Sequence, residues 1–139
     1  MWTYEPFDFD NYYTPDFALH LQQTVLVEVK PVLWDGSKRD RTIIEGAQEK
    51  LTAWDGEALI LGARVFSSAG SAQPLFGYMR TADRAWGEAF SFYCNTCKRR
   101  SFGARHASRC RVSGCTGAAK WNEAKWDVEA DLCAASNHV

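Results

Sequence analysis

The pattern of apolar and polar positions predicts β-strands in the first half of the chain. Residues 2–9 alternate loosely, as a short edge strand does, and residues 17–21 alternate like a half-buried strand. The run TVLVEVKPVL, residues 24–33, is apolar or β-branched at nearly every position, which is typical of a central strand covered on both faces. Pro31 predicts that regular pairing ends there. We therefore expect two adjacent strands joined by a short polar turn at residues 22–23.

A helix and a further strand are predicted next. Between residues 39 and 54 the apolar positions recur at intervals of three and four, as they do on one face of a helix: Ile43, Ile44, Ala47, Leu51 and Trp54. Residues 57–66, EALILGARVF, predict another strand, and the strand–helix–strand order favours parallel pairing with the strand at 24–33. The same helical spacing in the tail predicts an amphipathic helix over residues 121–132.

Four cysteines form two closely spaced pairs, Cys94-x2-Cys97 and Cys110-x4-Cys115. The residues between the pairs, KRRSFGARHASR, are too polar for a packed core, so four thiolate ligands around Zn²⁺ are favoured over buried reduced cysteines. Four protein ligands leave no open position, so the zinc is expected to be structural. His106 is an alternative ligand, although a solvent-facing or phosphate-facing role is favoured for it.

The chain has room for one globular domain and a small appendage, with 139 residues of which 46% are hydrophobic. The stretch SSAGSAQP, residues 67–74, predicts the boundary. We expect a core at residues 1–73 and a zinc-binding module, ending in the C-terminal helix, at residues 74–139. The predicted fold class is α/β, with a mixed sheet flanked by helices and a small zinc-ribbon-like module.

Three charged side chains stand at defined places on the first predicted hairpin. Glu28 and Lys30 are two residues apart in an otherwise apolar strand and so share one face of it. Asp16 precedes the partner strand, and the hairpin would bring its carboxylate beside that of Glu28. Because a buried charge is costly unless it is paired or binds a metal, the three predict a site for Mg²⁺ or Mn²⁺ suited to phosphodiester hydrolysis. The alternative is a solvent-exposed edge hairpin with an ordinary Glu28–Lys30 surface pair.

Pro15-Asp16, followed after eleven residues by Glu28-Val29-Lys30, resembles the PD-(D/E)xK motif of the restriction-endonuclease-like nuclease superfamily. The segments YYTPDF and LVEVKP are especially similar to the amino-terminal nuclease domain of TnsA-type transposon end-cleaving subunits and to small phage-encoded nucleases. The resemblance covers roughly residues 2–66. It implies a restriction-endonuclease-like mixed sheet, with Asp16, Glu28 and the Val29 carbonyl as metal ligands and Lys30 at the attacking water.

Two further features follow from the resemblance. Gln48 lies where some exonuclease-like members place a supporting glutamine, but Thr52 stands where an aromatic is usual. Members of the superfamily also usually open with a helix before the first strand, and the short segment before Asp16 predicts that this helix is missing. Its replacement by Glu5, by the helix at 121–132 or by a second subunit is left open, and the last would make the enzyme an oligomer.

The net charge of −1 conceals a strongly basic segment. Between Cys94 and Cys115 there are six cations and no acid: Lys98, Arg99, Arg100, Arg105, Arg109 and Arg111. Such a segment attracts phosphate, and in a nuclease we expect these residues to contact DNA in a salt-dependent way. A solvated charged face is the alternative.

The sequence as a whole predicts a Mg²⁺-dependent DNA endonuclease, of phage or mobile-element origin, whose zinc module binds DNA. The alternative is a non-catalytic protein, either a zinc-ribbon nucleic-acid-binding adaptor or an inactive nuclease relative. No run of residues is apolar enough to span a membrane, and the acidic, aromatic start does not resemble a signal peptide. We expect a cytoplasmic protein, in the host cell cytoplasm if phage-encoded.

Overall fold

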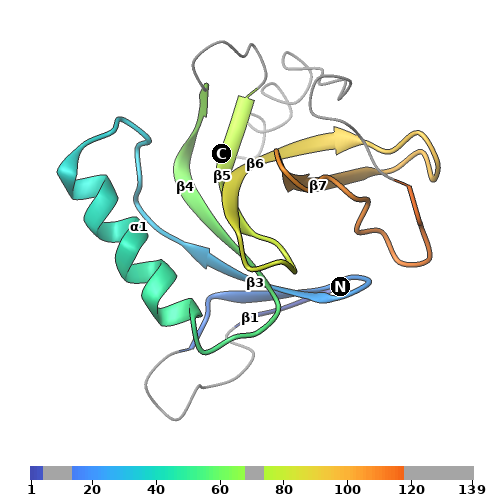
Figure 1. Ribbon diagram of the computed structural model, residues 1–139, viewed down its shortest axis with the longest axis horizontal. Helices are drawn as coiled ribbons and strands as arrows, with labels where there is room; N and C mark the ends of the chain where they lie inside the picture. The colour runs from blue at the N-terminus through green and yellow to red at the C-terminus, as the bar shows by residue number, and fades with distance from the viewer. Residues whose placement is uncertain (5–13, 68–73, 118–139) are drawn as a thin grey trace.

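A mixed seven-stranded sheet with one helix forms the architecture of the computed structural model, which describes residues 1–4, 14–67 and 74–117 (Figure 1). The strands follow one another in the sheet in the order of the chain. Their bounds are Trp2–Tyr4 (β1), Phe17–His20 (β2), Thr24–Val29 (β3), Glu57–Ser67 (β4), Pro74–Arg80 (β5), Trp86–Tyr93 (β6) and Arg100–Ala104 (β7), and the helix α1 spans Lys38–Leu51. The fold is therefore of the α/β kind.

The helix α1 connects β3 to β4, which pair in parallel, as the strand–helix–strand order predicts. Every other neighbouring pair is antiparallel. Ser37 caps the helix, because its side chain accepts a hydrogen bond from the backbone N–H of Asp40. Ala47 and Leu51 face the sheet and are buried.

The core lies on both faces of the sheet. On the face that α1 covers, Ala47 and Leu51 pack against Ala18, Leu26, Ala58 and Ile60. The opposite face holds a second cluster, formed by Val25, Val27, Leu59, Met79, Ala89 and Ala104. A third cluster surrounds the cysteines and includes Leu75, Phe90 and Phe92. The near-continuous apolar run of β3 is thus explained by burial on both of its faces.

The sheet continues through the boundary that the sequence predicts near residue 73. β4 pairs with β5, with Ala58 opposite Arg80 and Ser67 opposite Pro74. Strands β5 to β7 therefore extend the same sheet as β1 to β4. Glu5 and the helix predicted at residues 121–132 lie outside the described residues. α1, the helix of the described part, is too short and too polar to cross a membrane.

Candidate functional site

The β2–β3 hairpin brings Asp16 and Glu28 to neighbouring positions. Phe17 pairs with Val27, and extending this antiparallel register by one residue places Asp16 opposite Glu28. Asp16 Oδ2 also accepts a hydrogen bond from the backbone N–H of Val29, at 2.8 Å. Since the N–H and C=O of one strand residue point to the same side, the Val29 carbonyl is directed toward the Asp16 strand. The arrangement therefore gathers two carboxylates and one main-chain carbonyl at one end of the hairpin.

Glu28 and Lys30 form an ion pair beside Asp16. Lys30 Nζ lies 2.6 Å from Glu28 Oε1, and the Lys30 backbone N–H donates to Leu61 O at 2.9 Å. Glu28 is 3% exposed, because β3 lies between β2 and β4 and α1 covers this face. A carboxylate at this depth needs a cation close by, and Lys30 supplies it.

The donor atoms at this end of the hairpin suit a hard divalent cation. Mg²⁺ and Mn²⁺ prefer oxygen ligands, and Mg²⁺ is commonly held by one or two carboxylates together with water and substrate phosphate. Asp16 and Glu28 match this ligand count. Gln48 lies on the sheet-facing side of α1, where it lines a hollow together with Arg41, Ile44, Glu45 and Tyr78.

The four predicted cysteines converge at the far end of the sheet and form a possible metal centre. Their Sγ atoms all lie within 4.8 Å of one another, and the Cys94–Cys115 and Cys97–Cys110 Sγ atoms are each 3.7 Å apart. A tetrahedral zinc ion with Zn–S bonds of about 2.3 Å requires sulfur atoms about 3.8 Å apart, whereas a disulfide requires about 2.0 Å. Among the described residues, these cysteines are the only group of three or more potential ligand side chains.

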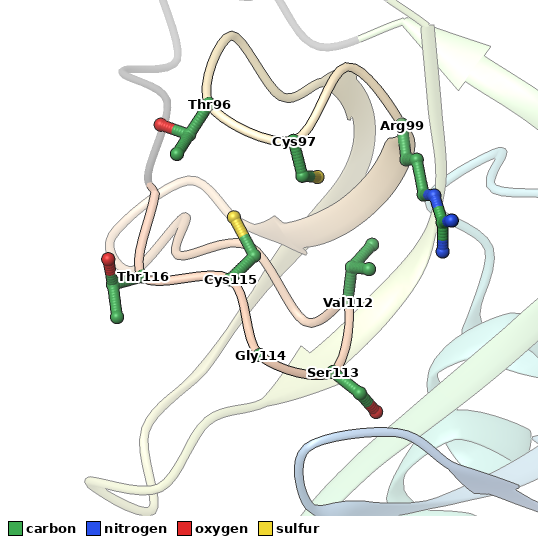
Figure 2. Close-up of a pocket in the computed structure, with 8 residues that line it drawn as sticks. All are labelled: Thr96, Cys97, Arg99, Val112, Ser113, Gly114, Cys115 and Thr116. Atoms are coloured by element: carbon green, nitrogen blue, oxygen red, sulfur yellow. The ribbon is translucent and has the colours of Figure 1, made fainter.

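Two tight turns present the cysteines to each other. Figure 2 shows the side chains of Cys97 and Cys115 in the space between these turns. In the first turn the Cys94 N–H donates to Arg99 O, and Lys98 has a positive φ of 60°. In the second turn the Cys110 N–H donates to Gly117 O. These backbone hydrogen bonds hold the four sulfur atoms in place.

The thiols differ in acidity. Backbone N–H donation, chiefly from Cys97, lowers the pKa of the Cys94 thiol to about 6, whereas burial raises the pKa of Cys97 and of Cys110. Zinc ligands are thiolates, so the N–H groups around Cys94 favour the form that binds the metal.

His106 lies apart from the cysteine cluster. Its Nε2 atom is 2.9 Å from Thr81 Oγ1, and the same hydroxyl donates to the Asp83 carboxylate. The cysteine group contains four ligands without it. The structure therefore does not favour zinc ligation by His106, which is exposed and contacts the Thr81 hydroxyl.

Arg111 is buried and cannot contact DNA as the sequence predicts. Its side chain is 2% exposed, with Nη2 2.6 Å from Glu57 Oε2 and Nε 3.2 Å from Glu57 Oε1. It also donates to the backbone oxygens of Phe102 and Arg109. Arg111 is therefore not one of the exposed cations of this segment.

The other five predicted DNA-binding residues reach the surface to different extents. Lys98, Arg99 and Arg100 are exposed next to the first cysteine turn. Arg105 is exposed but lies 3.5 Å from Glu88, and Arg109 is partly exposed and donates to Glu57 at 2.9 Å. Phosphate contact is therefore easiest for the first three.

Sequence reasoning missed two residues that join the cysteine centre to the rest of the sheet. Gln22, in the β2–β3 turn, donates from Nε2 to Val112 O at 2.6 Å and also reaches the carbonyls of Cys110 and Cys115. Glu57, at the start of β4, accepts hydrogen bonds from Arg109 and Arg111. The acid that opens the apolar strand EALIL was a usable signal for Glu57, by the argument applied to Glu28. The sequence offers no signal for the role of Gln22, because polar residues are common in turns.

Comparison with known proteins gives no match, whether with family models, curated proteins or solved structures. The resemblance of the Pro15-Asp16 and Glu28-Val29-Lys30 segments to the PD-(D/E)xK motif accordingly stays a prediction.

Proposed function

We propose that this protein is a metal-dependent nuclease of the PD-(D/E)xK type that hydrolyses phosphodiester bonds in DNA. The observation that supports this most is the convergence of three motif residues at one end of the β2–β3 hairpin. Asp16 Oδ2 accepts a hydrogen bond from the backbone N–H of Val29, the neighbour of Glu28, and Lys30 Nζ lies 2.6 Å from Glu28 Oε1. Glu28 and Lys30 share one face of β3 because they are two residues apart, and the hairpin adds the Asp16 carboxylate at the same end.

In this proposal Asp16, Glu28 and the Val29 carbonyl hold Mg²⁺ or Mn²⁺. When bound, such an ion lowers the pKa of a coordinated water and offsets charge on the phosphate. Lys30, held by Glu28, has N–H donors to orient the attacking water or to contact a phosphate oxygen. The burial of Glu28 keeps bulk water away from this pair, which strengthens its electrostatic interactions. Gln48 is assigned a supporting role from α1.

The cysteine centre is proposed to be structural in this enzyme. Four thiolates would fill the coordination shell of Zn²⁺, leaving no position for a substrate. Lys98, Arg99 and Arg100 protrude beside it, and we assign to them contacts with DNA phosphates that do not depend on sequence.

A second candidate function is nucleic-acid binding without cleavage. It is favoured by the closeness of the Glu28–Lys30 pair, since the Glu28 side chain is 4% exposed and already has its counter-ion. Such a pair can serve the fold alone. The two candidates differ in the role of Asp16. The nuclease needs Asp16 as a metal ligand, whereas a protein that only binds nucleic acid does not.

Cleavage of supercoiled plasmid and of a synthetic four-way junction tests the proposal. The purified protein is incubated with Mg²⁺, with Mn²⁺ or without either, and Asp16→Asn is compared with Asp55→Asn. Asp55 is the matched control because its side chain is 94% exposed in a surface pair with Arg84. The nuclease predicts metal-dependent cleavage that is lost in Asp16→Asn and retained in Asp55→Asn. Salt-sensitive DNA binding without cleavage of either substrate would favour the second candidate.

A further inference from the structure

A groove lies between α1 and the β4–β5 part of the sheet. It consists of two adjoining hollows of about 330 and 230 Å³, which share Arg41, Ile44 and Tyr78 in their walls. Trp34 and Phe66 line the larger hollow. Together the hollows have the size of a small-ligand site.

The wall of the groove is aromatic and firmly held. Trp34 stacks on Phe66 with ring centroids 4.6 Å apart, and its ring centroid is 5.6 Å from that of Tyr78. The indole lies directly over Gly62, where a Cβ would come within 2.2 Å of Trp34 Nε1. Trp34 also has a φ of 58°, a left-handed conformation that is costly for a large side chain. Close packing on a glycine therefore maintains this ring in place against backbone strain.

Side chains that can make three kinds of polar contact line the same groove. Arg41 is exposed and supplies a cation, Glu45 supplies acceptors, and Gln48 supplies both donors and acceptors. The Tyr78 hydroxyl is protonated and able to donate at neutral pH, as that of an ordinary tyrosine is, and burial raises its pKa further. A planar ring with polar edges, attached to a phosphate, has a partner here for each of its parts.

The groove lies next to the proposed hydrolytic site. Glu28 pairs with Ile60, and Ile60 pairs with Tyr78, so the three stand in one row across β3, β4 and β5 on the α1 face. Two strand spacings separate Glu28 from Tyr78, or about 10 Å between backbones. This separation is on the scale of one or two nucleotides of an extended strand.

We propose that this groove binds an unpaired nucleotide of the DNA substrate beside the phosphodiester that is cut. The base stacks on the aromatic wall, Glu45 and Gln48 meet its polar edge, and Arg41 contacts a neighbouring phosphate. The substrate class is then DNA with unpaired bases, such as a branch, a flap or a single strand, rather than continuous duplex. This inference rests on the proposed nuclease function and adds the substrate class to it.

Binding to the wild-type protein without added Mg²⁺ or Mn²⁺ tests the inference. The probes are a short oligothymidine, an abasic deoxyribose-phosphate strand of the same length, and thymidine monophosphate. Stacking of one base predicts that oligothymidine binds about tenfold more tightly than the abasic strand. Equal affinity for the two strands would overturn the inference. So would binding of the mononucleotide as tight as that of the oligonucleotide, because the groove would then be a site for free nucleotides.

A pair of variants places the effect in the molecule. Tyr78→Leu, which keeps most of the side-chain volume, is expected to reduce the preference for bases to about twofold or less. Tyr93→Leu is the matched control, since Tyr93 is an exposed tyrosine beside the cysteine turns, and it should retain the full preference. The reverse result would place base stacking at the cysteine turns and overturn the assignment of the groove.

The failures of the two proposals are distinguishable. Cleavage with no preference for base-bearing strands would leave the nuclease standing and remove the groove from it. A base preference that depends on Tyr78, in a protein that cleaves no DNA with any metal, would overturn the nuclease proposal. The groove would then bind a base, but the bound DNA would not be a substrate.

Discussion

The buried ion pair between Glu57 and Arg111 predicts a large loss of stability when its carboxylate is neutralised. Glu57 is 1% exposed, and its two oxygens accept from Arg111 and from Arg109 at 2.6 to 3.2 Å. Glu57→Gln keeps the shape but leaves the Arg111 charge without a counter-charge in the interior. Removing one partner of a buried pair costs about 3 to 5 kcal/mol, and we expect about 3 kcal/mol because the amide oxygen still accepts one hydrogen bond.

Urea unfolding with zinc held in excess measures this loss. With a urea slope of about 1 to 3 kcal/mol/M, a decrease of 3 kcal/mol in the free energy of unfolding moves the midpoint by about 1 M or more. Glu88→Gln is the matched control, because Glu88 is half-buried and lies 3.5 Å from Arg105, so it should cost less than about 1 kcal/mol. A Glu57→Gln protein no less stable than Glu88→Gln would refute the account of how the cysteine region is joined to the sheet.

Three further predictions concern the cysteine centre, the exposed cations and one surface carboxylate. Cys97→Ser should lose bound zinc, measured as metal per chain. Substitution of the fifth cysteine of the sequence, Cys133→Ser, should keep it, because Cys133 lies outside both cysteine pairs; full zinc in both variants would rule out the four-cysteine centre. Arg99→Ala should weaken DNA binding uniformly across sequences and lower the slope of log affinity against log salt by about one unit, and an unchanged slope would remove it from the interface. Hydrogen bonding, chiefly from the Thr81 hydroxyl, lowers the pKa of Asp83, so this carboxylate adds stability above its unfolded pKa that is lost as the pH falls through the folded value. NMR titration of Thr81→Val should show the Asp83 pKa moving up toward its ordinary value; no upward movement would contradict this assignment.

The strand–helix–strand unit could be predicted because its signals are local. Apolar residues at helical spacing predicted α1, which spans Lys38–Leu51, and Pro31 predicted the end of the pairing of β3. The helix stops at Leu51 rather than at Trp54, because Thr52 caps it and Trp54 turns to donate from Nε1 to Glu57 O. The cysteine cluster was also predictable, since metal ligands come at characteristic spacings.

The remaining features depend on contacts between distant parts of the chain. The addition of β5 to the edge of β4 is set by backbone pairing across a stretch whose composition resembles a linker. The burial of Arg111 follows from Glu57, 54 residues away in the sequence, so charge counting alone placed it on the surface. The aromatic groove was missed for the same reason: Trp34, Phe66 and Tyr78 come from three separate segments.

The ability of Lys30 to support cleavage tests the central claim most directly. Single-turnover cleavage and DNA affinity are measured on the same preparations of the wild type and of Lys30→Met, which keeps the length of the side chain without its charge. Loss of this donor at a transition state of phosphoryl transfer is expected to slow cleavage by a factor of about 100 or more while affinity changes little. Lys50→Met, on the exposed last turn of α1, is the control and should cut at the wild-type rate. Cleavage by Lys30→Met at the wild-type rate would contradict the assignment of this hairpin as a nuclease site. So would the absence of metal-dependent cleavage by the wild type and both variants.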